Sequence, residues 1–155
     1  MNHQDDIHIR PAQPREADAL SRLAMRSKAH WGYDQSFLDA CRDDLTVLPE
    51  RCDGTHLMLA ETDGVMAGWV EVRGDPPVGE LANLWVDPSF MGKSIGKALW
   101  NAALDLARSL AFTELNIDSD PHAEGFYRHM GATRIGETRS TVYPDRRLPL
   151  MKVTL

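Results

Sequence analysis

The sequence has few cysteines and no long apolar run. Its 155 residues include only Cys41 and Cys52, too few for a disulfide scaffold and without the spacing of metal ligands. Six scattered histidines form no HExxH motif, so we expect no metal site. No apolar run approaches membrane-spanning length, and the polar, acidic N-terminus is unlike a signal peptide. These absences predict a cytoplasmic protein with no membrane partner.

Basic residues are also fewer than acidic ones. The chain has 17 Lys and Arg against 23 Asp and Glu, which gives a net charge of −6. Proteins that bind nucleic acid generally need a basic surface, so the composition argues against a nucleic-acid partner. Hydrophobic residues make up 43% of the chain and charged residues 26%, as in ordinary globular proteins. The length predicts a single domain over residues 1–155 with a substantial core.

Apolar periodicity and turn signals predict alternating strands and helices. The expected strands are residues 7–10, 56–60, 65–72, 80–86, 113–117, 133–138 and 148–155. One helix is expected to start at Pro14 and end near His30, and a second to start at an N-cap on Ser36 and close at Pro49. A short helix capped by residues 118–121 should end at Gly131. Alternation alone supports a mixed α/β sheet.

The most informative stretch is residues 81–110, a strand, a loop of small residues and a long helix. The strand ends at Asp87-Pro88, and the loop runs through Gly92, Ser94 and Gly96. The helix has a predicted apolar stripe of Ile95, Leu99, Ala102, Leu106 and Leu110. A helix start has unpaired N–H groups and partial positive charge, and small residues let an anion approach them. We therefore expect a phosphate site here, although a merely tight connection also needs small residues.

Two familiar phosphate-binding motifs are missing from this stretch. There is no GxxxxGK[ST], which excludes a P-loop. There is also no GxGxxG followed about twenty residues later by an acidic residue, so a dinucleotide-binding Rossmann unit is disfavoured.

The loop resembles motif A of the GNAT superfamily of acyl-CoA-dependent N-acyltransferases. The resemblance rests on Val86-Asp87-Pro88 followed by Met91-Gly92-Lys93-Ser94-Ile95-Gly96, and on a downstream segment at residues 123–132, AEGFYRHMGA. It implies a GNAT-like α/β fold with a mostly antiparallel, twisted sheet of about seven strands flanked by four helices. The implied element order is β-α-α-β-β-β-α-β-α-β-β.

The resemblance implies acetyl-CoA as co-substrate and transfer of its acetyl group to a primary amine in a ternary complex. The strand backbone would bind pantetheine and the helix start would bind pyrophosphate. The implied cofactor-binding residues are Leu84, Trp85, Val86, Met91, Gly92, Lys93, Ser94, Ile95, Gly96, Lys97, Phe126 and Tyr127. Met91 stands where the family has Arg or Gln, and Ser94 stands where it has glycine. Both departures predict weaker binding of CoA.

The implied chemistry needs an acid and a route for removing a proton from the amine. An alkyl ammonium group has a pKa of about 10, so a base must accept its proton. By the resemblance, Tyr127 donates a proton to the departing thiolate, and Glu80 is the candidate base. A packed structural tyrosine, and ordered water in place of Glu80, remain the alternatives.

The sequence indicates the identity of the acceptor amine less clearly than that of the acetyl donor. Polar-tipped aromatic and acidic side chains are the candidates to bind it, namely His30, Trp31, Tyr33, Asp118, Ser119 and Tyr143. The shortness of the chain favours a small molecule, with a protein N-terminus or lysine as the alternative. A non-catalytic acyl-CoA-binding module is a second alternative. The C-terminal strands are candidates for pairing in a homodimer.

Overall fold

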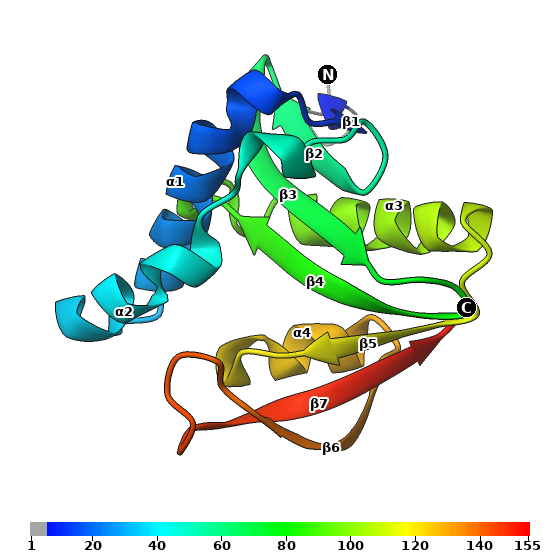
Figure 1. Cartoon of the computed structure of the whole chain (residues 1–155). Helices are drawn as coiled ribbons and strands as arrows, with labels where there is room; N and C mark the ends of the chain where they lie inside the picture. Colours follow the sequence, from blue (N-terminus) through cyan, green and yellow to red (C-terminus); the bar gives the residue numbers. More distant parts are fainter. Residues whose placement is uncertain (1–5) are drawn as a thin grey trace. The chain divides into compact units, whose positions relative to one another are not determined.

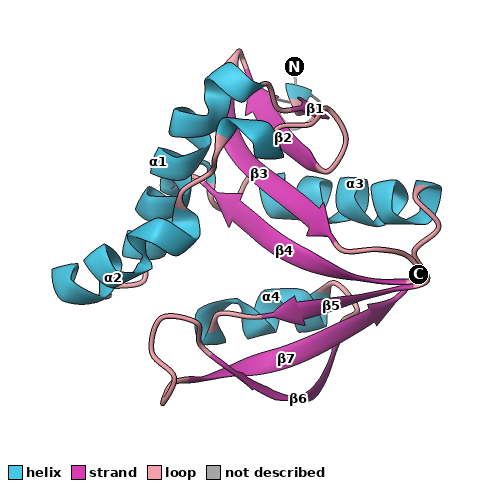
Figure 2. Cartoon of the chain, in the orientation of Figure 1, coloured by secondary structure: helices cyan, strands magenta, loops and turns pink. Residues whose placement is uncertain are grey.

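The computed structural model describes residues 6–155 and has the predicted mixed α/β fold, with the predicted element order (Figures 1 and 2). The strands in this range are β1 (His8–Pro11), β2 (Leu57–Thr62), β3 (Val65–Arg73), β4 (Val78–Val86), β5 (Glu114–Asp118), β6 (Thr133–Arg139) and β7 (Arg147–Thr154). The helices are α1 (Ala17–Ala29), α2 (Gln35–Leu45), α3 (Ile95–Ser109) and α4 (Glu124–His129).

The strands form a seven-stranded sheet in the order β1-β2-β3-β4-β5-β7-β6. β1–β2, β2–β3, β5–β7 and β6–β7 are antiparallel pairs, whereas β4 and β5 are parallel. The mostly antiparallel sheet predicted from the resemblance is therefore confirmed.

The chain divides into two compact units, which are described separately below. The first comprises residues 6–71 and 83–102, and the second comprises residues 72–82 and 103–155. β3, β4 and α3 each contribute to both units. A single domain over residues 1–155 stays a prediction.

In the first unit, β3 separates two layers of helix. The Trp69 indole N–H donates a 3.0 Å hydrogen bond to the Leu20 carbonyl of α1, so this face of β3 packs against α1. The opposite face of β3 packs against α3, because a Cβ built on Gly68 would meet Ile95 and Leu99 of that helix. α1 buries the face predicted for it, formed by Ala17, Leu20, Leu23, Ala24 and Ser27.

The connection between β2 and β3 is the predicted hairpin turn. Asp63 and Gly64 both have positive φ, 51° and 76°. Two successive left-handed residues match a type I′ turn, whose twist suits the flanking strands. The Asp-Gly pair in the sequence is the usual choice for this geometry.

Three local predictions were wrong. α2 ends at Leu45 and not at Pro49, which begins a separate 3₁₀ turn. The N-cap of α2 is Asp34, whose carboxylate accepts a 2.8 Å hydrogen bond from the Phe37 N–H, and Ser36 lies inside the helix. The stripe of α3 is rotated from the predicted one, because the buried residues are Ile95, Leu99, Trp100, Ala103 and Ala107. Ala102, Leu106 and Leu110 are only half-buried, since the core follows steps of four along this helix rather than mixed steps of three and four.

Gly68→Ala should destabilise the fold. The added Cβ would lie 2.6 Å from the Trp85 carbonyl oxygen and 2.9 Å from Leu99 Cδ1, so backbone has to shift. Overpacking of this kind costs about 1–3 kcal/mol, measurable by urea denaturation. Gly125→Ala is the matched control, because nothing lies within 4 Å of its Cβ position; a loss of stability equal to that of Gly68→Ala would contradict the packing argument.

Candidate functional site

The loop between β4 and α3 holds two residues in the left-handed region of backbone space. A 3₁₀ turn, Pro88–Phe90, follows β4, and Met91 leaves it in an extended conformation. Gly92 then has φ 79° and Ser94 has φ 67°, and α3 begins at Ile95. The positive φ of Ser94 accords with the expectation that a glycine would suit this position better.

This backbone leaves the start of α3 open to an anion. The Ala98 N–H donates to the Ser94 carbonyl at 3.1 Å. The N–H groups of Ile95, Gly96 and Lys97 precede that bond, so helix geometry provides them with no acceptor within α3. No atom lies within 4 Å of a Cβ built on Gly92. A phosphate can therefore approach the backbone closely here.

An ion pair ties this loop to α1. The Arg26 guanidinium donates to Asp87 Oδ2 from Nη2 at 2.7 Å and from Nε at 3.0 Å. Asp87 Oδ1 accepts from the N–H and hydroxyl of Ser89, which caps the 3₁₀ turn. Burial raises the pKa of Asp87, but the hydrogen bonds from Ser89 and Arg26 outweigh it and hold that pKa below its usual value. The loop is thus held at the point where it leaves β4.

In the second unit, three polar residues share one face of the β4–β5 pair. The parallel register runs from Val78–Glu114 to Glu80–Asn116, and β4 continues to Val86 beyond it. Glu80 is exposed and lies beside Asn116, while Asp118 lies two residues further along β5. Desolvation raises the pKa of the Asp118 carboxyl.

Asn116 carries a buried acceptor that no described residue satisfies. Its Oδ1 has no hydrogen-bond partner in residues 6–155. A buried amide oxygen without a donor is costly, by about 1–3 kcal/mol. The atom thus has unused capacity to accept a hydrogen bond, on the face that also carries Glu80.

Tyr127 lies in α4 and is 7% exposed. Its ring makes an edge-on contact with Phe126, with centroids 5.4 Å apart. Burial, and to a lesser extent the negative charge of Asp120, raise the pKa of the Tyr127 hydroxyl above its ordinary value. The hydroxyl is therefore protonated at neutral pH and able to donate.

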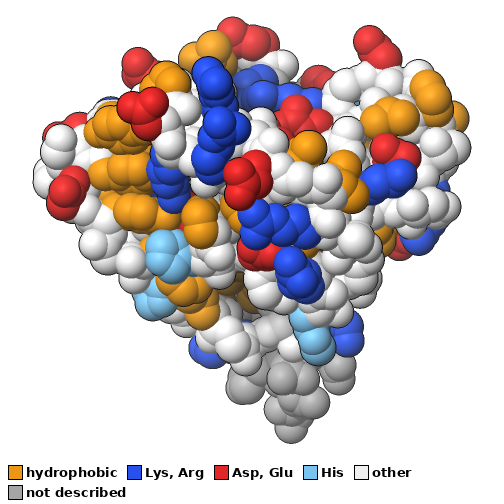
Figure 3. All heavy atoms as spheres, turned by 90° about the horizontal axis from the view of Figure 1, so that it is seen from below, with side chains coloured by type: hydrophobic (Ala, Val, Ile, Leu, Met, Phe, Trp, Pro, Cys, Tyr) orange, Lys and Arg blue, Asp and Glu red, His pale blue; other side chains and the backbone are white. Residues whose placement is uncertain are grey.

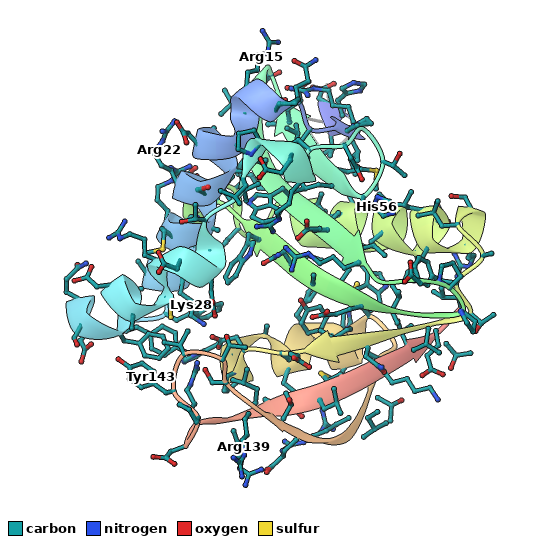
Figure 4. The ribbon with its side chains drawn as sticks, viewed as in Figure 1. Arg15, Arg22, Lys28, His56, Arg139 and Tyr143 are labelled. Atoms are coloured by element: carbon teal, nitrogen blue, oxygen red, sulfur yellow. The ribbon has the colours of Figure 1, made fainter. Side chains whose placement is uncertain are left out.

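The aromatic residues predicted to bind an acceptor surround the end of α1 in the first unit. His30 and Trp31 contact each other edge-on at 5.3 Å, and Trp31 is exposed. Tyr33 stacks on Phe37 with centroids 4.3 Å apart. Lys28, labelled in Figure 4, is buried, and its ammonium nitrogen lies 5.0 Å from the centre of the Tyr33 ring.

The remaining candidates lie in loops of the second unit. Ser119 is 1% exposed, and its hydroxyl donates a 2.7 Å hydrogen bond to the Asp120 carbonyl, so it supports the turn. Tyr143 is exposed in the loop between β6 and β7 (Figure 4).

Sequence reasoning did not identify several residues whose polar groups the fold buries. Glu71 on β3 is 2% exposed, and its carboxylate binds Arg51 and Asn83. The available signal was a single charged residue within the apolar strand MAGWVEV. Asn116 and Lys28 gave no signal, since an isolated Asn or Lys is usually exposed.

Comparison with known proteins identifies the family of the chain. Residues 18–132 match the model of the Acetyltransferase (GNAT) family. The chain is 31% identical over 144 residues to a mycothiol acetyltransferase of Sanguibacter keddieii, covering 88% of this chain and 45% of that protein. It is 32% identical over 89 residues to the N-alpha-acetyltransferase RimI of Mycobacterium tuberculosis, covering 54% of this chain and 56% of that one.

The fold has a close counterpart in PaiA N-acetyltransferase from Thermoplasma acidophilum, solved in complex with coenzyme A. The TM-score is 0.78 at 17% identity, with 96% of this chain and 99% of that chain covered. This protein therefore belongs to the GNAT acetyltransferase family. It spans about half the length of the two curated relatives it matches.

Two features are absent from residues 6–155. None of the helices there has the length and apolar character needed to cross a membrane. No group of three or more His, Cys, Asp or Glu side chains in that range is placed to hold a metal ion. Figure 3 shows acidic and basic side chains interspersed on one face of the molecule.

Asp87→Asn should reduce stability in a pH-dependent way. The folded-state pKa of Asp87 lies below its unfolded value of about 3.9, so its contribution is full above that pH and is lost as pH falls through the folded pKa. Because Arg26 is half exposed, we expect a difference of about 1 kcal/mol at pH 7. Urea denaturation between pH 2.5 and 7 measures it. A wild-type–variant difference that stays constant over this range would contradict the assignment.

Proposed function

We propose that this protein transfers the acetyl group of acetyl-CoA to a primary amine by direct attack in a ternary complex. The observation that carries the proposal is the pair of left-handed residues, Gly92 and Ser94, which opens the start of α3 to an anion within a family motif. The pyrophosphate would bind the N–H groups of residues 91–97.

The pantetheine arm would extend along the end of β4. Its amides would pair with the backbone of Leu84, Trp85 and Val86, as an added strand does. One N–H of this segment would polarise the thioester carbonyl and stabilise its oxyanion. Met91 supplies no charged contact, so the affinity for CoA would depend mainly on backbone donors, with Phe126 contributing an apolar contact.

Tyr127 is proposed to donate a proton to the departing thiolate of CoA. A free thiol has a pKa of about 8.5, so an alkyl thiolate is a better leaving group when a donor is close. Burial keeps the Tyr127 hydroxyl protonated throughout the neutral range. The raised pKa keeps this hydroxyl a hydrogen-bond donor in the resting enzyme, but it also makes Tyr127 a weaker acid than an exposed tyrosine.

Glu80 is proposed as the base, with Asn116 and Asp118 beside it. A protonated amine has N–H groups to donate, and this face offers two carboxylates and one unsatisfied amide oxygen. We infer that Glu80, which is exposed, removes the proton of the amine, with the polar Asn116 beside it on the same face. Removal of the proton through ordered water is the alternative route.

The acceptor is proposed to be a small molecule with a primary amine. His30, Trp31, Tyr33 and Tyr143 are the proposed contacts, together with Asp118; Ser119 would act through the turn that it supports. The name N-alpha-acetyltransferase of one relative points instead to an α-amino terminus. Both acceptors present a primary amine, so the chemistry at Glu80 is the same. We propose a cytoplasmic location.

Acetyl-CoA should stabilise the protein against heat. A ligand at one hundred times its Kd adds about 2.7 kcal/mol, which raises the Tm by several degrees. We expect acetyl-CoA and CoA, but not NAD, to raise the Tm in a thermal-shift titration.

Two matched variants localise this effect. Gly92→Ala and Gly54→Ala both place a Cβ on a left-handed residue in open space. Only Gly92→Ala should weaken the response to acetyl-CoA. No rise in Tm for the wild type would refute the proposed function, and acetyl-CoA binding without thiol release across an amine panel would favour a non-catalytic module.

Tyr127→Phe should lower kcat by about 10²–10⁴-fold while leaving the Kd for acetyl-CoA within about twofold, since it removes only the proton donor. Thiol release from CoA, followed with a chromogenic disulfide, measures kcat. An unchanged kcat would remove Tyr127 from the mechanism.

Glu80→Gln serves as the companion variant in the same assay. If Glu80 is the base, the acid limb of the wild-type pH–rate profile disappears in the variant. A profile of the same shape in both proteins would assign deprotonation to water.

A further inference from the structure

We propose that a chain of polar residues centred on the buried Glu71, Arg51–Glu71–Asn83, holds the Trp85 indole as a fixed wall beside the acetyl group, so that Trp85 selects the acceptor by size. These four residues are called the Trp85 network below. The inference rests on the proposed function, because it assigns the specificity of that same site.

The Trp85 network is continuous through four hydrogen bonds. Arg51 donates to Glu71 from Nη2 to Oε1 at 2.7 Å and from Nε to Oε2 at 3.1 Å. Asn83 Nδ2 donates to Glu71 Oε1 at 3.0 Å. The Trp85 indole N–H donates to Asn83 Oδ1 at 2.9 Å.

Each member of the Trp85 network limits the orientation of the next. Paired contacts from the Arg51 fork fix the plane of the Glu71 carboxylate. An ionised carboxylate only accepts hydrogen bonds, so Asn83 must turn its NH₂ toward Glu71 and its oxygen toward Trp85. The Glu71 side chain is 3% exposed, so water competes little for these bonds. The indole is therefore held back along β4 toward Asn83.

The Trp85 side chain lies on the face of the sheet that α1 covers. Trp69 and Glu71 are two residues apart on β3, and their side chains therefore share a face. Trp69 bonds to α1, and Asn83 reaches Glu71 across the strands, so Asn83 and Trp85 share that face. α3 packs on the opposite face, against Gly68.

The position of Trp85 on β4 would place its side chain between the thioester and an approaching acceptor. Its backbone belongs to the segment proposed to bind pantetheine, and its partly buried side chain projects to the side where His30, Trp31 and Tyr33 follow α1. An amine approaching from that side would meet the indole next to the thioester. A held aromatic plane excludes bulky acceptors more strictly than a mobile one. Trp85 is thus a specificity residue, and Asn83, Glu71 and Arg51 are positioning residues.

The first test follows the indole N–H signals by ¹⁵N NMR in the full-length protein. CoA and acetyl-CoA differ only in the acetyl group, so the Trp85 signal, assigned with Trp85→Phe, should differ between the two complexes. The Trp69 signal should be the same in both. Asn83→Leu should move the Trp85 signal in the free protein and leave the Trp69 signal in place.

The second test measures acceptor selectivity with alaninamide and tryptophanamide, two α-amines that differ in bulk. Trp85→Ala should raise the ratio of kcat/KM for tryptophanamide over alaninamide by about tenfold. Asn83→Leu should raise it by a smaller factor. Trp69→Phe is the matched control, because it loses an indole hydrogen bond in the core and should lower the Tm without changing the ratio.

Identical Trp85 signals in the CoA and acetyl-CoA complexes would overturn the inference and leave the proposed function intact. An unchanged selectivity ratio in Trp85→Ala would do the same. Failure of the wild type to bind either CoA or acetyl-CoA would remove the proposed function, and this inference with it.

Discussion

The transition from β4 into α3 is the constraint on which the candidate site depends. A strand has to end, turn and present the first N–H groups of a helix without satisfying them internally. Gly92 and Ser94 achieve this by adopting positive φ, at a cost that only glycine avoids. The Arg26–Asp87 ion pair and the Asp87 cap then hold the point where the turn begins. Ser94 adopts the left-handed conformation although its Cβ makes positive φ less favourable than it is for glycine.

Buried polar groups on the sheet differ in how many of their hydrogen bonds are made within the protein. Glu71 and Asn116 are the two contrasting cases. Glu71 accepts hydrogen bonds from Arg51 and Asn83, so the orientation of its carboxylate is held. Asn116 leaves one buried oxygen without a donor among the described residues. The first arrangement suits a scaffold that orients a neighbour, whereas the second leaves hydrogen-bonding capacity unused. Both residues lie on strands, where rigid backbone limits the freedom of their side chains.

The pKa of Tyr127, the proposed acid, also depends on how deeply the residue is buried. Tyrosine hydroxyls lose protons near pH 10 in water, yet burial moves the pKa of Tyr127 upward. The Asp118 carboxyl, on a neighbouring element of the same unit, also has a raised pKa because of desolvation. In both groups desolvation disfavours the charged form.

Much of the fold was predictable from the sequence, because local patterns carry it. The period-two alternation of the strands, the Asp63-Gly64 turn, the C-terminal glycine of α4 and the order of the two family segments are all encoded within short stretches. They led to the strands and helices of a mixed α/β fold and to the loop that precedes α3, whereas the full element order was implied by the resemblance to the GNAT superfamily. The start of α2 was predicted less well, because Asp34, and not the predicted Ser36, caps the helix through its bond from the Phe37 N–H.

Tertiary structure alone decided which distant side chains meet. Arg51, Glu71, Asn83 and Trp85 come from a turn and two strands, and no spacing rule links them. The buried side of α3 was likewise set by the surface it packs against, because Ala102 and Ala103 are equally apolar as residues. The sequence by itself determined most elements and the small-residue turn before α3, since those depend on the backbone preferences of neighbouring residues. Only the folded chain determined the Trp85 network, since hydrogen bonds between separate strands depend on register and on exclusion of water.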